Sequence, residues 1–163
     1  MFGRMIAFGV VSLLVFPSIA APDVPAAKKS PADPQIMSFK TVEIHDSDGE
    51  LRRLLKLRYN AAGEDLRART TLYKLGRVKF DELAASLQRF TKAGAEVAET
   101  PVAKVTELEL AHNAALWMEA VVSERFVQEV DPVQIMKHAR VVRYDLEIEL
   151  YRARALVKAA AAK

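Results

Sequence analysis

The sequence predicts an all-α protein in which two long antiparallel αα-hairpins pack as a four-helix coiled-coil bundle. Three observations indicate this fold. Helical periodicity runs from Glu50 nearly to the end of the chain. The breaks in it are short, and connections of about two to five residues force neighbouring helices to be antiparallel. The chain contains no cysteine, so helix packing has to stabilise it without disulfides.

The N-terminus has the pattern of a signal peptide. Arg4 precedes an apolar run, Ile6–Phe16, which Pro17 ends before small residues at positions 18–20. This run is too short to span a bilayer, which argues against the alternative of an uncleaved membrane anchor. We therefore predict that residues 1–20 are a signal peptide, cut at their end or one residue later. The protein is expected to be exported, periplasmic or extracellular.

Residues 21–47 are predicted to be a disordered Pro/Ala-rich tether that includes a short extended segment. Pro22–Pro34 holds four prolines among Ala, Lys and Ser, a composition that cannot form a core. Phe39–Ile44 alternates apolar and polar residues as a strand would. No second strand is predicted to pair with it, so we expect this segment to lie across a helix surface.

The helical-hairpin domain, predicted for residues 48–160, begins with a helix that ends at Gly76. Ser47 and Glu50 fit a capping box at its start. Tyr73 closes the apolar stripe of this helix, and Gly76 stands where a helix favours a left-handed C-terminal residue. Tyr73 and Gly76 are therefore predicted to make the first turn.

The second helix, about Lys79–Glu99, has the most regular apolar stripe. Its members alternate spacings of three and four residues, which is coiled-coil periodicity: Phe80, Leu83, Leu87, Phe90, Gly94 and Val97. Thr100 and Pro101 start a third helix at once, because proline is favoured at the first helical position. Asp131 and Pro132 are predicted to make the second turn and to cap the fourth helix.

The third helix is apolar nearly all round between Ala114 and Val122, more than one neighbouring helix would cover. Trp117 lies in this stretch. A packed core position is one interpretation of Trp117, and a contact with another chain is the other. We predict a homo-oligomer, or a protein partner bound through helix packing, that engages Trp117.

No catalytic residue, cofactor or metal site is predicted. Glu109 and His112 form a Glu-x-x-His motif like those of di-iron bundles, but such a site needs a second copy of the motif. Tyr59 stands at the position that matches His112, so that copy is missing. The sequence has no nucleophile elbow and no phosphate-binding glycine loop.

Charge gives little support for nucleic acid or direct membrane binding. The formal charge of +3 falls to +2 when Arg4 is removed with the signal peptide, and the remaining charges are mixed along the chain. We expect no nucleic-acid partner, and association with a membrane only through other proteins.

The two hairpins resemble each other at a nearly constant offset. Tyr59-Asn60-Ala61-Ala62 matches His112-Asn113-Ala114-Ala115 at an offset of 53 residues. Val78–Val97 follows Val130–Glu149 at an offset of 52 residues. The period and the turn positions agree, which favours an internal duplication.

One run of residues resembles a known family. Leu72-Tyr73-Lys74-Leu75-Gly76-Arg77-Val78-Lys79-Phe80-Asp81-Glu82-Leu83 is similar to the helix-turn-helix signature of the TolC-like outer-membrane efflux family. In the second hairpin, Glu129 or Gln128 stands where the glycine of this signature belongs. The resemblance covers roughly residues 51–155 and implies duplicated helical hairpins, export, and a role in efflux close to the outer membrane.

The expected function is that of an exported, non-enzymatic helical-hairpin protein that acts through protein contacts in the cell envelope. Two alternatives stay open. One is a periplasmic holdase chaperone, because long helical hairpins after a signal peptide suit that role too. The other is a degenerate bundle metalloprotein or enzyme.

Overall fold

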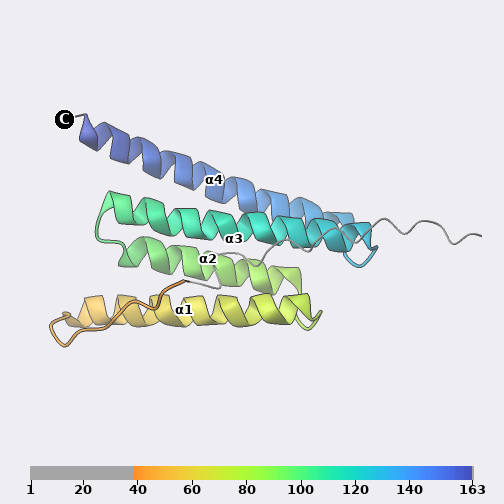
Figure 1. The fold of residues 1–163 in the computed structure, drawn as a ribbon, viewed down its shortest axis with the longest axis horizontal. Helices are drawn as coiled ribbons and strands as arrows, with labels where there is room; N and C mark the ends of the chain where they lie inside the picture. Colours follow the sequence, from red (N-terminus) through yellow and green to blue (C-terminus); the bar gives the residue numbers. More distant parts are fainter. Residues whose placement is uncertain (1–38, 163) are drawn as a thin grey trace, which may run out of the picture.

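The computed structural model describes residues 39–162, which form four helices packed as a bundle (Figure 1). The helices are α1 (Glu50–Lys74), α2 (Phe80–Val97), α3 (Pro101–Val127) and α4 (Val133–Ala161). No strand occurs among the described residues, so the all-α prediction is confirmed. The predicted signal peptide and the Pro-rich part of the predicted tether lie outside the described residues.

The bundle is held together mainly by contacts between helices that follow one another in the chain. α1 packs on α2, α2 on α3, and α3 on α4, while α2 and α4 touch over a small area. In Figure 1 the helices lie side by side in chain order, and α4 diverges from α3 toward its C-terminal end. The turn from α1 to α2 and the turn from α3 to α4 lie at the same end of the molecule.

The apolar stripe predicted for α2 forms the centre of the core. All its members are buried: Phe80, Leu83, Leu87, Phe90, Gly94 and Val97. They pack with apolar residues of α1, such as Leu66, and of α3, such as Met118. Because α2 has neighbours on both sides, its apolar residues lose nearly all their contact with water, which is the main force that holds the bundle together.

Residues 39–48 cross the surface of the first two helices, as expected for the extended segment. The Phe39 ring packs edge-on against the rings of Tyr59 of α1 and Phe90 of α2. The distances between ring centroids are 6.1 Å to Tyr59 and 5.7 Å to Phe90. The side-chain amide of Asn60 accepts a hydrogen bond from the Val42 backbone N–H at 2.8 Å and donates one to the Val42 carbonyl at 2.9 Å. The segment is therefore fixed to α1 by its backbone and by one buried aromatic side chain.

A glycine of α1 makes room for this aromatic side chain. A Cβ added at Gly63 would lie 2.2 Å from the Phe39 Cζ atom, which is closer than two carbon atoms can approach. Glycine weakens a helix interior because it loses more backbone entropy than other residues on folding. At position 63 the close approach of Phe39 requires it.

The Ser47/Glu50 capping box is not formed, so that prediction was wrong. The residue before α1 is Gly49, which has no side chain to accept a backbone hydrogen bond. Asp48 instead binds the buried Lys56 ammonium, whose Nζ donates to both carboxylate oxygens at 2.7 and 2.6 Å. The Lys56 hydrogen bond lowers the pKa of Asp48, and so does a bond from the His45 backbone N–H. A buried ion pair thus holds the start of α1.

The cap predicted for α3 is confirmed, whereas the side-chain cap predicted for α4 is not. Thr100 Oγ1 accepts a hydrogen bond from the Ala103 N–H at 3.0 Å, and Pro101 is the first helical residue. Pro132 precedes α4 without a side-chain cap. The Asp131 carboxylate does not cap α4, because it is turned toward α1.

Candidate functional site

The two helix turns have the same hydrogen-bond pattern. At the end of α1, the Gly76 N–H donates to the Tyr73 carbonyl and the Arg77 N–H to the Leu72 carbonyl, each at 2.9 Å. At the end of α3 the equivalent bonds occur 53 residues later, from Glu129 to Phe126 at 3.0 Å and from Val130 to Arg125 at 2.9 Å. Both are Schellman motifs, which require a residue with positive φ after the helix.

Gly76 has φ +67°, as predicted for the turn, and Glu129 has φ +59°. Glu129 is the one non-glycine residue with positive φ in the described part of the chain. It therefore takes the backbone conformation in the second turn that Gly76 takes in the first. This conformation costs a non-glycine residue about 1 kcal/mol because its Cβ crowds the backbone.

The predicted turn residues Tyr73 and Asp131 come together in one network. The Tyr73 hydroxyl donates to Asp131 Oδ2 at 2.7 Å, and Arg125 Nε donates to the same oxygen at 2.7 Å. The Arg125 guanidinium also lies over the Tyr73 ring, 4.9 Å from its centroid. Burial, and then the hydrogen bond with Asp131, raise the pKa of Tyr73, so it stays a neutral donor. The network joins the end of α1 to the turn between α3 and α4.

Trp117 is packed inside the chain. It is 5% exposed, and Lys74 Nζ lies 5.3 Å from the centroid of its ring. Its indole Nε1 has no hydrogen-bond partner within the described structure. Because the ring has so little exposed surface, a partner protein has little of Trp117 to contact, and the interaction surface has to be sought elsewhere.

The two residues of the Glu-x-x-His motif lie in different surroundings. Glu109 forms an ion pair with Arg154 of α4, at 2.7 Å, and His112 Nε2 is buried without a hydrogen-bond partner in the described part of the chain. Within residues 39–162 no three His, Asp or Glu side chains are placed to hold a metal ion.

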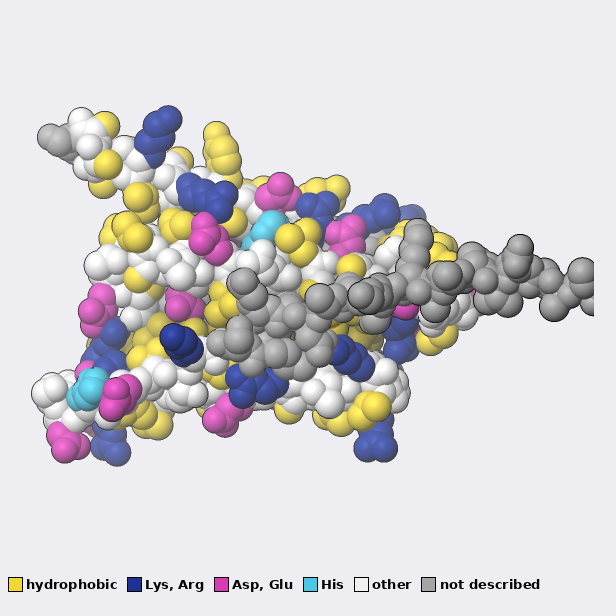
Figure 2. All heavy atoms as spheres, viewed as in Figure 1, with side chains coloured by type: hydrophobic (Ala, Val, Ile, Leu, Met, Phe, Trp, Pro, Cys, Tyr) yellow, Lys and Arg dark blue, Asp and Glu magenta, His cyan; other side chains and the backbone are white. Residues whose placement is uncertain are grey.

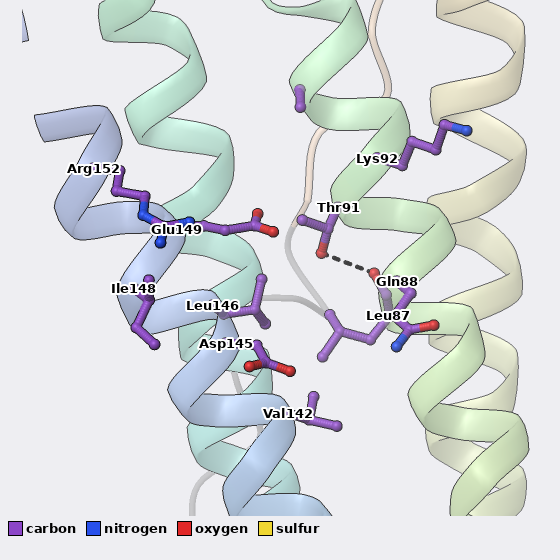
Figure 3. A pocket seen from close by; sticks show the side chains of 11 residues that line it. Leu87, Gln88, Thr91, Lys92, Val142, Asp145, Leu146, Ile148, Glu149 and Arg152 are labelled. Carbon is purple, nitrogen blue, oxygen red and sulfur yellow. Dashed lines mark hydrogen bonds between the residues drawn. The ribbon is translucent and has the colours of Figure 1, made fainter. Parts of the chain in front are cut away.

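A groove of about 620 Å³ lies between α2 and α4 (Figure 3). Leu87 of α2 and Val142 and Leu146 of α4 provide its apolar surface. In Figure 3, Asp145 and Glu149 extend from α4 toward α2, while Lys92 points away from α4. The groove exists because α4 packs on α3 and touches α2 only slightly.

The rim of this groove carries polar side chains that are free to bind. Gln88, Asp145, Glu149 and Arg152 make no hydrogen bond or ion pair with any other described residue. Glu149 and Arg152 also line a second hollow of about 300 Å³ between the start of α3 and the end of α4. The two hollows are thus adjacent along the C-terminal half of α4. An apolar floor with charged rims is suited to an amphipathic helix.

Sequence reasoning did not find this groove. Leu87 belongs to the apolar stripe predicted for the second helix, and Val142 and Leu146 of α4 are buried beside it. Periodicity identifies the buried face of each helix but not the distance between two helices that are not neighbours in the chain. Two free charges four residues apart beside a buried stripe, such as Asp145 and Glu149, are too common on helices to indicate a site.

None of the four helices of residues 39–162 combines the length and the hydropathy of a membrane span. Comparisons with protein-family models, with curated proteins and with solved structures find no match to this chain.

Proposed function

We propose that this chain is an exported, non-enzymatic helical-hairpin protein that acts through protein contacts in the cell envelope. The observation that carries the proposal is the groove between α2 and α4, with its apolar floor and unpaired polar rim. Its chemistry fits an amphipathic helix of another protein, which would lie along the groove and pair polar side chains with Gln88 and Glu149 on the rim. Efflux in particular is proposed only on the resemblance of the first turn to TolC-like proteins.

The two turns support the view that the bundle consists of two duplicated hairpins. Each has a Schellman motif with the same hydrogen bonds, and the residues with positive φ, Gly76 and Glu129, stand at matching positions. A Schellman motif by itself is common at helix ends and does not indicate duplication. Together with the sequence match at the same offset, the pair of motifs favours duplication of one αα-hairpin as the origin of the fold.

Site-specific photo-crosslinking in cells tests the groove as a protein-binding site. A photoreactive residue at Gln88, on the rim, should give one discrete adduct that is found in the envelope fraction. The same residue at Glu64, which is exposed on α1, is the matched control and should give none. No adduct at Gln88 would contradict the proposal.

The holdase alternative rests on a different surface. Large apolar side chains are exposed around the two turns, namely Leu75, Phe126, Val127 and Val130. A holdase would give many adducts of different size rather than one, and it would suppress aggregation of an unfolded client protein at substoichiometric amounts. The same crosslinking experiment, with the photoreactive residue at Val127, separates the two functions.

Export is tested by the mass of the protein in the envelope fraction. The proposal expects a chain that begins at Ala21 or Pro22. If the chain begins at Met1 instead, the assignment to the cell envelope is overturned.

A further inference from the structure

A second apolar stripe runs along the face of α4 that points away from the bundle. Its large members are all well exposed: Val141 is 54% exposed, Tyr144 51%, Ile148 49% and Tyr151 76%. Ala155 follows four residues later and is exposed too. We call these five residues the outer stripe of α4. Their spacings of three and four residues are those of a coiled-coil seam.

The large side chains of the outer stripe are about half exposed or more, although the Arg143 guanidinium lies 4.1 Å from the centroid of the Tyr144 ring and Ile148 also lines the groove. The opposite face of α4 is the one that packs on the bundle, through Ala139, Val142, Leu146, Leu150 and Ala153. α4 forms one edge of the molecule, and hydrophobic side chains stand out along that edge at the top of Figure 2. A continuous apolar seam on an exposed helix is typical of a surface for association.

We infer that this seam binds the outer stripe of a second copy of the same chain, with the two α4 helices antiparallel. The charges beside the stripe fit a second copy of this chain, and the sizes of the side chains decide between the two directions. Going along the helix they are acidic at Asp145 and Glu147 and then basic at Arg152 and Arg154. Reversing a second copy places each acid opposite a base, in the flanking positions that determine the pairing of coiled coils.

One register satisfies all these charges. When Ile148 lies opposite Tyr151 of the second copy, Asp145 lies opposite Arg152 and Glu147 opposite Arg154. Each pair occurs twice because the dimer is symmetric. Shifting the register by one heptad in one direction places Asp145 against Asp145, and in the other direction it places Arg152 against Arg152.

Side-chain size favours the same arrangement over a parallel pair. In the antiparallel register the small Ala155 faces the large Tyr144, so that the layers have similar volumes. A parallel pair would stack Tyr144 on Tyr144 and leave Ala155 against Ala155. Antiparallel helices also bring opposite ends of their dipoles together.

The charges that would pair are available. Asp145 and Arg152 make no ion pair within residues 39–162. The Glu147 side chain is 54% exposed and forms an ion pair with Arg143 of its own chain. The Arg154 side chain is 58% exposed and forms one with Glu109. The seam from Val141 to Ala155 is roughly 21 Å long at 1.5 Å per residue, so the contact is small and the dimer reversible.

Analytical ultracentrifugation of the purified chain at high micromolar concentration tests the dimer. Asp145→Arg should raise its dissociation constant about tenfold or more by placing like charges together. Adding Arg152→Asp to the same chain should restore the wild-type value. A parallel pair would not recover, because the carboxylate introduced at position 152 would then face Glu147. Circular dichroism should show unchanged helicity in each variant.

Disulfide formation tests the register, and the absence of native cysteine keeps the background clean. A chain that carries both Tyr144→Cys and Ala155→Cys should form a covalent dimer, whereas neither single variant should. A dimer from Tyr144→Cys alone would show a parallel pair and overturn the inference. So would a wild-type chain that stays monomeric at every concentration.

This inference rests on the proposed function, contact between proteins, and names one partner. The two fail separately, because Ala95 lines the groove from α2, whereas Tyr144 and Tyr151 of the outer stripe do not line it. Ala95→Trp should lose the adduct at Gln88 and keep the dimer. Tyr151→Glu should lose the dimer and keep the adduct.

Discussion

At the scale of the single residue, the backbone of Glu129 is the clearest case of strain. Its φ of +59° is the conformation that glycine adopts freely and other residues adopt at a cost. Glu129 is exposed and makes no side-chain hydrogen bond or ion pair within the described structure. The turn therefore gains nothing visible from this side chain.

Glu129→Gly should stabilise the protein by about 0.5–1 kcal/mol, because it removes the strain of the left-handed backbone. Thermal unfolding followed by circular dichroism measures the change. Gly76→Val is the reciprocal control and should lower the melting temperature by several degrees. A Cβ at Gly76 meets no atom within 4 Å, so any loss there comes from the backbone alone. Equal stability of wild type and Glu129→Gly would contradict the argument.

Asp65 joins three side chains of the first hairpin and determines part of its response to acid. Burial raises the pKa of Asp65, but hydrogen bonds from Ser86, Arg89 and Arg69 outweigh this and lower it to about 2. The folded state thus holds the carboxylate ionised below its ordinary pKa of 3.8. Its stabilising contribution is complete above pH 3.8 and is lost as the pH falls toward about 2.

Asp65→Asn should therefore cost about 1–2 kcal/mol at neutral pH and flatten the decline of stability in that acidic window. Urea unfolding at several pH values measures both effects. Asp46→Asn is the control, because Asp46 is exposed and has no ion pair within the described residues, and it should leave the stability at neutral pH unchanged. If Asp65→Asn follows the wild-type pH profile, the carboxylate does not carry the acid response.

At the scale of the element, the segment before α1 is part of the bundle although it is not helical. Its attachment depends on the space above Gly63 that is occupied by the Phe39 ring. The Phe39 carbonyl also accepts a hydrogen bond from Arg67 at 3.5 Å, and the Arg67 guanidinium lies 4.6 Å from the centroid of the ring. Aromatic burial and two backbone hydrogen bonds at Val42 together anchor the segment.

Gly63→Ala should destabilise the protein by about 1–3 kcal/mol, because the added methyl group overlaps the Phe39 ring. Gly49→Ala is the matched control, with no atom within 4 Å of the added Cβ, and should be nearly neutral. In a Phe39→Ala background the cost of Gly63→Ala should vanish or change sign, since alanine favours a helix over glycine by about 1 kcal/mol. Denaturant titration of the four variants measures the coupling, and additive costs would rule out the overlap.

Gly94 on α2 is a contrasting case. The sequence gives no reason why Gly94→Ala should be harmful. In the structure an added Cβ would lie 3.0 Å from Glu107 Oε2 and 3.2 Å from its Cβ. Glu107 is held in place because its carboxylate accepts a hydrogen bond from the Tyr59 hydroxyl at 2.9 Å. The gain in helix propensity at position 94 is therefore opposed by crowding of α3.

At the scale of the whole molecule, residues 39–162 offer two adjoining surfaces on α4, which share Ile148, and a buried core around Trp117. Trp117→Glu should unfold the protein, because it places a carboxylate where 5% of the side chain reaches water. Tyr151→Glu, at a position that is 76% exposed, should keep its helicity. Circular dichroism at low concentration compares them, and a helical Trp117→Glu chain would mean that the ring is not part of the core.

The sequence by itself determined the four helices, their boundaries within a few residues, and the buried face of each. Periodicity fixes which residues face inward, and Gly76, Thr100 and Pro101 mark helix ends by local stereochemistry. The same local rules failed at Ser47 and Asp131. At both places a carboxylate binds a cation six or eight residues away, Asp48 with Lys56 and Asp131 with Arg125, and the predicted capping pattern does not form.

Only the tertiary structure decided which surfaces are left for other molecules. The sequence directed attention to Trp117, because apolar residues surround it on the helix. Packing buries that ring and leaves the α2–α4 groove and the outer stripe of α4 exposed instead. The physical reason is that exposure depends on the positions of helices relative to one another. Those positions result from the sum of many long-range contacts, and the pattern along one helix does not contain them.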